Sequence, residues 1–425
     1  MAVNTISMGQ VKNLINYTID NNLKLQEDGK TPIALGLEAS AGIGKTSIVQ
    51  QIAEERGMGF TKIDLHQLEE AGDLLGWPAP EYECQILQRY KDDKGDMKVR
   101  VLPQTVWVNS KQLEEGAGAN MKYKQTGKTR MSYAKPAWVP EYNEQGNLVC
   151  LDDYTRANPQ LLQSSMDLIL EQKYVSWSLP KKTTIILTAN ADNGEYNVNS
   201  LDEAQRTRFM NFEVEFDANT WASWAERVNI DGRCINFALS YAHELFDADD
   251  EGNRICNPRS FVMFANSISG ITDWDKQENL EFINTIARGC FKDNGRFANM
   301  FAAFIRNKMH LIIQPKQMLI SDWATVRQKL EDTLYDSTGQ YRPDIASLLE
   351  RRFSGYVDAW LDSADKTPIQ KVVDRILDFI NNPDKGGKML FTKDQFFHMV
   401  KSITSNHRNQ TNRLLMEPKI AKIVS

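Results

Sequence analysis

Cysteine and histidine are scarce in this sequence, and neither residue type is clustered. There are five cysteines and five histidines among 425 residues. No two cysteines form a Cys-x-x-Cys pair, so we expect neither a disulfide framework nor a structural metal site. Widely separated thiols are typical of a protein that stays reduced in a cytoplasm. The cysteines lie at positions 84, 150, 234, 256 and 290.

Long apolar runs and a strong excess of one charge are also missing. No run approaches the ~20 apolar residues that span a bilayer, and the amino-terminal segment lacks the layout of a secretory signal. Hydrophobic residues make up 41% and charged residues 25%, as in a globular protein with two or three domains. The formal net charge of −6 argues against a protein that coats nucleic acid. We therefore expect a cytoplasmic protein without a membrane-bound part.

Strand and helix patterns alternate through the first half of the chain. Apolar spacing predicts a helix over residues 7–24, and a second helix follows a glycine-rich loop and ends near Gly57. A third is expected where Asn158 and Pro159 supply an N-cap and a first-turn residue. This alternation favours an α/β fold with a parallel sheet covered by helices. Strands are expected at residues 33–39, 60–65, 148–153 and 212–216, and in the segment that ends at 190.

Two segments and the second half of the chain depart from this alternation. Residues 77–146 are rich in turn-forming and charged residues, so we expect an insertion or a set of exposed loops. Residues 173–182 have the pattern of a hairpin before the next strand. From about residue 217 onward only helical periodicity is found, so this half should be helical.

The glycine-rich loop fits the phosphate-loop pattern Gly-x-x-x-x-Gly-Lys-Ser/Thr, except that Ala39 replaces the first glycine. Gly42 and Gly44 let backbone N–H groups turn toward phosphate oxygens, and the following helix directs its positive end there. Lys45 would reach the β- and γ-phosphates of ATP, and Thr46 would bind Mg²⁺. A glycine-rich turn with an incidental lysine is the alternative. The predicted binding residues are Ser40, Ala41, Gly42, Ile43, Gly44, Lys45, Thr46 and Ser47.

Polar residues end two of the predicted strands. Asp152 and Asp153 follow a buried run, which places them at the carboxyl edge of the sheet, where ligands bind in open α/β sheets. Asp152 would hold Mg²⁺ through water, and Asp153 would activate the attacking water. Asn190 ends the next strand and could position that water. Solvated loop acids and an asparagine cap are the structural alternatives.

Arginines follow in two further segments. Arg206 and Arg208 precede a strand, and each could be a surface charge or an arginine finger that acts on a neighbouring subunit. Arg259 lies in the first turn of a helix behind Pro258. A cation there opposes the helix dipole, so we expect an anionic partner, and a γ-phosphate is one candidate.

These motifs, in this order, resemble those of the MoxR-like group of AAA+ ATPases. The second nucleotide motif of that group usually reads Leu-Asp-Glu-Ile/Phe-Asn-Arg-Ala-Pro-Pro, and this chain has a close variant at residues 151–159. The similarity is dense over residues 30–265 and vague beyond them. It rests on the phosphate loop and on the stretches DLLGWPAPE, AKPAWVPEYNEQGN, LDDYTRANPQLLQS, LTAN, LDEAQRTRF and NPRSF.

The resemblance implies a homo-oligomeric ring, commonly a hexamer, with ATP and Mg²⁺ at the subunit boundaries. It implies an AAA+ core over residues 1–216 with an insert at about 77–146, a helical lid over 217–285 and a further helical region over 286–425. Within that scheme Asn190 is the first sensor, Arg208 the finger acting in trans, and Arg259 the second sensor. Arg156 would lie near a subunit boundary. The insert and the hairpin commonly face the central pore in this group.

Two departures from the group's pattern affect the expected rate. Ala39 is a mild one, because the position needs a small residue more than a positive φ. Asp153 stands where the group usually has glutamate, whose side chain is one methylene longer. A shorter carboxylate lies farther from its water, so we expect slower hydrolysis than a glutamate would give.

The leading functional hypothesis is an ATPase that remodels or assembles a protein partner. Since MoxR-like proteins often work with a von Willebrand A domain protein and none is encoded here, that partner would be a separate chain. A nucleic-acid motor is the main alternative. The hairpin favours it, because its lysines and aromatic residues could grip a single strand. The third hypothesis is a nucleotide-dependent switch that hydrolyses ATP slowly or not at all, which Asp153 keeps open.

Overall fold

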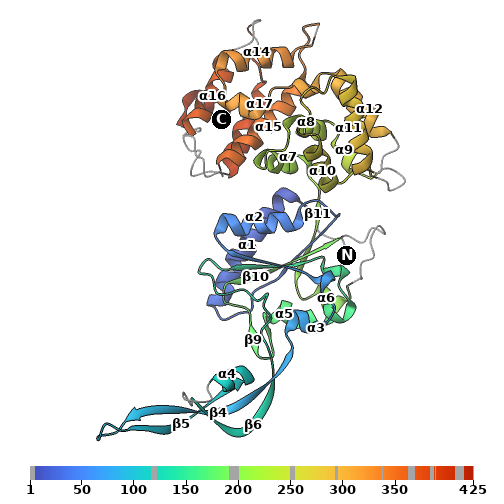
Figure 1. The fold of residues 1–425 in the computed structure, drawn as a ribbon. Helices are drawn as coiled ribbons and strands as arrows, with labels where there is room; N and C mark the ends of the chain where they lie inside the picture. The colour runs from blue at the N-terminus through green and yellow to red at the C-terminus, as the bar shows by residue number, and fades with distance from the viewer. Residues whose placement is uncertain are drawn as a thin grey trace. The chain divides into compact units, whose positions relative to one another are not determined.

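The first half of the chain forms a sheet because its central strands are apolar and buried over nearly their whole length. Ile186 on the central strand lies in register beside both Leu35 and Cys150. Burial on both faces is typical of parallel sheets. In the computed structural model six parallel strands pair in the order β1 (Thr5–Ser7), β11 (Met210–Glu215), β2 (Leu35–Ala39), β10 (Thr183–Asn190), β7 (Asn147–Asp152) and β3 (Gly59–Asp64) (Figure 1).

The chain divides into two compact units, Met1–Glu215 and Phe216–Ser425. The predicted α/β fold with a parallel sheet, followed by a helical region, is confirmed. Strand β1 is too short for a periodic pattern and was not predicted. The structure describes residues 5–115, 122–190, 201–248, 254–291, 295–336, 338–361, 369–382, 387, 389–406 and 416–424.

The three predicted helices of the first unit are present, and the first, expected over residues 7–24, runs from Met8 to Glu27. Ser7 and Gln10 form a capping box at the start of the first helix, and Gly57 ends the second with a φ of 65°. Asn158 accepts a hydrogen bond from the backbone N–H of Gln160, so it caps the helix as predicted. Helices α1 (Met8–Glu27) and α2 (Lys45–Arg56) cover one face of the sheet, and α3 (Ala71–Leu75) and α5 (Pro159–Glu171) cover the other (Figure 1). The short helix α6 (Glu203–Arg206) precedes β11.

The turn-rich segment is not a set of loops. It forms a separate antiparallel sheet in the order β5 (Met97–Asn109), β4 (Pro78–Lys91), β6 (Tyr123–Tyr133), with helix α4 (Ser110–Glu115) after β5. Its strands lack a clear apolar alternation, because many of their side chains are charged and pair with side chains on the neighbouring strand. Arg130 binds Glu81 at 2.7 Å and covers the ring of Trp107 at 4.5 Å. Cross-strand pairs of this kind stabilise a sheet that has little apolar surface to bury.

The predicted hairpin is present as β8 (Lys173–Tyr174) and β9 (Trp177–Ser178), but its aromatic residues face the protein. Trp177 is 9% exposed, and its indole N–H donates to the Leu75 carbonyl at 2.9 Å. Tyr174 meets Tyr133 edge to face at 5.1 Å between ring centroids. The expectation that these rings are free to stack on bases is therefore wrong for Trp177. Burying the large apolar indole stabilises the folded protein more than leaving it in water would.

The second unit is helical, as expected. The helices are α7 (Ala218–Arg227), α8 (Gly232–Ser240), α9 (Ala242–Phe246), α10 (Pro258–Ser267), α11 (Gln277–Cys290), α12 (Arg296–Arg306), α13 (Pro315–Ile320), α14 (Trp323–Leu334), α15 (Pro343–Leu361), α16 (Ile369–Asn381), α17 (Lys393–Asn406) and α19 (Pro418–Val424). Within the described residues, no helix is both long and apolar enough to cross a membrane.

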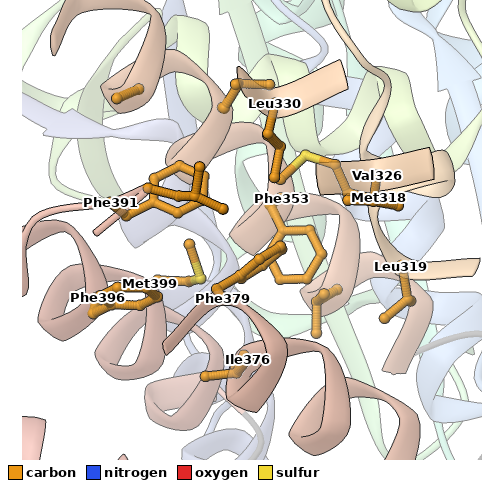
Figure 2. Packing of buried hydrophobic residues seen from close by; sticks show 14 of the residues in the cluster. Met318, Leu319, Val326, Leu330, Phe353, Ile376, Phe379, Phe391, Phe396 and Met399 are labelled. Atoms are coloured by element: carbon orange, nitrogen blue, oxygen red, sulfur yellow. The ribbon is translucent and has the colours of Figure 1, made fainter. Parts of the chain in front are cut away.

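Two apolar clusters hold these helices together. An aromatic cluster between Trp221 and Ile305 surrounds Phe237 and includes residues of α11 and α12. A second cluster, between Ile312 and Ile420, contains Phe353 of α15 and Phe379 of α16, whose rings meet edge to face at 5.4 Å (Figure 2). Each cluster is large enough to exclude water from its helices' apolar faces, which is the main source of their stability.

Charged groups are buried between α7 and α15. The side chain of Arg352 is 0% exposed, binds Glu226, and donates to the Asn236 side-chain oxygen at 2.7 Å. Glu350 is 7% exposed, and among the described residues its carboxyl group accepts one hydrogen bond, from Ser354 at 3.5 Å. Burial raises the pKa of Glu350 to about 7, against the smaller opposing effects of Arg351 and Ser354.

The buried carboxyl of Glu350 predicts a pH-dependent stability. Its folded pKa lies above the ordinary value of 4.5, so the folded state binds more protons and the free energy of unfolding falls as pH rises from about 4.5 to about 7. We expect Glu350→Gln to stabilise the protein by roughly 2 kcal/mol at about pH 8, allowing for partial solvent access, and by less below about pH 5. Thermal unfolding at both pH values measures this. The control is Asp344→Asn on the same helix, and equal Tm shifts at both pH values would contradict the prediction.

Candidate phosphate and metal site

The glycine-rich loop lies between β2 and α2, where a phosphate loop must lie. Gly42 and Gly44 have φ angles of 81° and 99°, in the left-handed region that glycine adopts without strain. Gly44 is the N-cap of α2, so the helix begins at Lys45. The first backbone N–H groups of a helix have no partner within it, and together with the helix dipole they attract anions.

Lys45 connects this loop to the neighbouring strand β10. The residue is 7% exposed, and its ammonium group donates to the carbonyl oxygens of Ala39 at 2.9 Å and Ser40 at 3.1 Å. It also donates to the side-chain oxygen of Asn190 at 3.1 Å. Residues 39 and 190 lie in register on adjacent strands, which is why two segments 145 residues apart meet here. The ammonium therefore lies where it can bind an anion held by the loop.

Asp152 ends β7 and is held by two hydroxyl groups and one ammonium group. Its Oδ1 accepts hydrogen bonds from Thr46 Oγ1 at 2.7 Å and from Thr188 Oγ1, and its Oδ2 is 3.1 Å from Lys62 Nζ. Burial alone would raise the pKa of Asp152, but the hydrogen bonds from Thr188, Thr46 and Lys62 outweigh it and hold the pKa below its usual value. The carboxylate is thus ionised at neutral pH.

Asp153 follows in a left-handed conformation, with φ 51° and ψ 40°. Its Oδ1 accepts a hydrogen bond from Asn190 Nδ2 at 3.0 Å, and its Oδ2 lies 3.3 Å from Arg156 Nη1 and 3.7 Å from His66 Nδ1. Aspartate and asparagine adopt this conformation more readily than other residues with a side chain. The backbone therefore supplies a local reason for aspartate at this position.

Four residues of this network were not predicted as site residues. Thr188 donates to Asp152, and His66 lies beside Asp153. Lys62 bridges Asp64 at 2.6 Å and Asp152, and the hydrogen bond with Asp64 is the main reason that the pKa of Lys62 is raised. The signal for Lys62 and Asp64 is weak in the sequence, because only the pairing of β3 with β7 sets Asp64 beside Asp152.

Of the predicted arginines in the first unit, Arg156 contacts Asp153, whereas Arg206 and Arg208 have other partners. Arg208 follows α6 and forms an ion pair with Asp167 of α5 at 3.1 Å, and Arg206 donates to the Leu201 carbonyl at 3.0 Å. Arg259 belongs to the second unit, on α10, where it is exposed. Within the described residues, the anionic partner that we expect for Arg259 is not seen.

The arrangement suits binding of a polyphosphate with a divalent cation. The loop, the N-terminus of α2 and the Lys45 ammonium group provide positive potential. The Thr46 hydroxyl and the Asp152 carboxylate, 2.7 Å apart, provide the oxygen ligands that Mg²⁺ prefers, so the residues fit this ion. Asp153 and Asn190 lie beside them with side-chain atoms that can accept a proton and orient a water molecule.

Comparison with known proteins adds little to this geometry. No protein-family model and no curated relative matches the chain. The chain aligns with the Holliday junction branch migration motor RuvB of Thermotoga maritima at 12% identity and a TM-score of 0.30, over 79% of this chain and 87% of that one. It also aligns with a candidate ATPase from Cytophaga hutchinsonii at 12% identity and a TM-score of 0.27, over 97% of this chain and 95% of that one. Both TM-scores are low, and we draw no conclusion about this chain from them.

Proposed function

We propose that this chain is an AAA+ ATPase of MoxR type that binds and hydrolyses Mg-ATP to remodel or assemble a protein partner. One observation supports this most strongly. Lys45, Thr46, Asp152, Asp153 and Asn190 come from three separate segments and meet at the carboxyl ends of β2, β7 and β10. Asn190 links Lys45 to Asp153 by hydrogen bonds, and Thr46 is hydrogen-bonded to the neighbouring Asp152. A structural turn has no need of that convergence, whereas phosphoryl transfer requires each of these groups.

Each residue of the network has a role in the proposed reaction. The phosphate loop and Lys45 would bind the β- and γ-phosphates, and Thr46 and Asp152 would hold the metal ion. Mg²⁺, when bound, would neutralise charge on the phosphates. Asp153 accepts the proton of the attacking water, and Asn190 orients both Asp153 and Lys45 through its two side-chain atoms.

The proposed assembly is a cytoplasmic homo-oligomeric ring, of hexameric form by resemblance. Residues 217–285 would form the lid and 286–425 a further helical region that docks the partner or braces neighbouring subunits. Arg208 would complete the ATP site of the adjoining subunit, and Arg259 would sense the γ-phosphate from the lid. The partner would be a separate protein, for which a von Willebrand A domain protein is a candidate.

Arg208 provides a test of the ring. Its present ion pair with Asp167 is exposed, so breaking it costs little stability. We expect Arg208→Ala to bind Mg-ATP within about 3-fold of wild type and to lose roughly 10³-fold in turnover. Mixing Arg208→Ala with Lys45→Ala should restore part of the phosphate release, because the second variant supplies the arginine and the first supplies the nucleotide site. Arg206→Ala is the control, and absence of recovery on mixing would contradict action in trans.

A nucleic-acid motor remains the second candidate function, with weaker support from the hairpin than the sequence suggests. Lys173 forms an ion pair with Glu171 at 2.7 Å, and Lys182 donates to the Glu144 carbonyl at 2.8 Å. The burial of Trp177 removes one of the two aromatic rings of the hairpin that could stack on bases. Salt-sensitive stimulation of the ATPase by single-stranded DNA would favour the motor over the remodeller.

The proposal as a whole is tested on the wild-type chain. Calorimetric titration with Mg-ATP should show binding, and a steady-state phosphate-release assay should show turnover. Binding without turnover would leave the nucleotide-dependent switch as the function. Absence of adenine nucleotide binding by well-folded protein would overturn the proposal.

A further inference from the structure

A cavity of about 500 Å³ lies within the second unit, between α7, α15 and α17. Small residues line it where α7 and α15 pack, among them Ala222, Ser223, Ser354 and Gly355. A Cβ added to Gly355 would lie 2.5 Å from Ser223 Oγ, so the helices approach as closely as this glycine allows. Phe353 of α15 points into the second apolar cluster (Figure 2), while Glu350, Ser354 and Gly355 line the cavity.

The charged groups that line the cavity differ in how well their hydrogen-bonding capacity is met. Arg352 is fully engaged by Glu226 and Asn236. Arg351 is exposed and donates to the Ser347 carbonyl at 3.3 Å and the Asn219 side chain at 3.4 Å. Glu350 is buried, and among the described residues only Ser354 donates to its carboxyl group, at 3.5 Å.

That hydrogen bond is weak, because the Ser354 hydroxyl has one proton and lies closer to the Glu350 backbone carbonyl, at 2.9 Å. A buried carboxyl group without a good donor is destabilising by itself. The group is thus an acceptor that faces the cavity and lacks a strong donor in the chain.

We propose that this cavity binds a small organic cation, an ammonium or guanidinium group, which donates hydrogen bonds to the Glu350 carboxylate. The hydroxyl groups of Thr220, Ser223 and Ser402 line the same cavity and would accept the remaining N–H groups. Anions fit less well, since they would lie against Glu350 and Glu226. Of the two arginines that line the cavity, Arg352 is paired with Glu226, and Arg351 donates to Ser347 and Asn219. The cation comes from a free small molecule or from an arginine side chain of a peptide. The inference is independent of the ATPase proposal, because all of its residues belong to the second unit.

Calorimetry on the full chain tests the proposal with two probes. Agmatine represents a free cation, and the capped tripeptide Ala-Arg-Ala represents an arginine side chain. We expect at least one to bind with a Kd below about 1 mM, and glutarate, an anion of similar length, not to bind. Binding of agmatine alone identifies a small-molecule site, and tighter binding of the tripeptide identifies a peptide site. Binding of neither, or of glutarate alone, overturns the proposal.

Two variants locate the binding. Glu350→Gln should lower the affinity for whichever probe binds by at least about 10-fold, because a charge-assisted hydrogen bond is replaced by a neutral one. Ser402→Phe, at an exposed lining position, should weaken it by blocking the cavity without disturbing the buried residues. Asp344→Asn, outside the cavity on α15, is the control and should bind as wild type. Unchanged affinity in both cavity variants contradicts the assignment.

Proton release on ligand binding distinguishes a binding role of Glu350 from a purely structural one. The carboxyl group is partly protonated near pH 7, and a bound cation would favour its ionised form. The other charged or titratable groups that line the cavity are Glu226 on α7, Arg351 and Arg352 on α15 and His398 on α17. Titrations in buffers with different ionisation enthalpies should therefore show protons released on binding to wild type and not to Glu350→Gln. Equal release in both proteins would place the ligand elsewhere.

Discussion

Replacing Lys45 with alanine is expected to lower ATP turnover by roughly 10²–10³-fold and to weaken Mg-ATP binding. The ammonium group is the one buried cation at the loop in the described structure, and it lies 2.9 Å and 3.1 Å from two loop carbonyls. Removing it takes away both the charge that binds the phosphates and the donor that holds Asn190. Calorimetry with Mg-ATP and a phosphate-release assay measure the two effects separately.

Two companion variants separate charge from packing. Lys45→Met keeps most of the side-chain volume, so it should fold like wild type and still lose turnover. Lys30→Ala removes an exposed lysine that forms an ion pair with Asp28 on the surface, and turnover should be unchanged. If Lys45→Ala and Lys45→Met both hydrolyse ATP at the wild-type rate, the loop is a structural turn and the proposed function is wrong.

Replacing Asp153 with asparagine is expected to slow hydrolysis by orders of magnitude while nucleotide binding persists. Asparagine adopts the left-handed conformation seen at φ 51° about as readily as aspartate, so the backbone should not change. An amide cannot accept the proton of the attacking water, and loss of a general base lowers rates by about 10²–10⁴-fold. We expect the single-turnover rate of hydrolysis to decrease by a factor in that range and the Kd for Mg-ATP to change by less than about 3-fold. Such a variant would also retain its protein partner for identification by affinity purification.

Asp153→Glu tests why this chain uses the shorter acid. We expect faster single-turnover hydrolysis, because the extra methylene brings the carboxylate nearer to the water. Glutamate is less suited to the left-handed backbone, so some loss of stability should accompany the gain. Asp93→Asn, at an exposed position between β4 and β5, is the control for both variants. A glutamate variant that is no faster would show that the backbone conformation, not the reach of the side chain, explains the aspartate.

Local features of this protein follow from the sequence by itself. The apolar runs predict the central strands, but they do not reveal the helix cap at Ser7. Asn158 and Gly57 mark helix ends as expected, and the glycines of the loop imply its left-handed turns. The sequence also places Lys45, Thr46, Asp152 and Asn190 at strand and helix ends. These predictions succeed because propensity, capping and side-chain period act over a few residues.

Tertiary structure alone decides which of these ends become neighbours. The order of strands in the sheet sets Lys62 and Asp64 beside Asp152, although the sequence of β3 contains no motif that indicates a binding site. Packing also buries Trp177 and leaves Glu350 facing a cavity across from α7. Contacts between distant segments depend on which apolar faces must be buried together, and a local pattern does not contain that information.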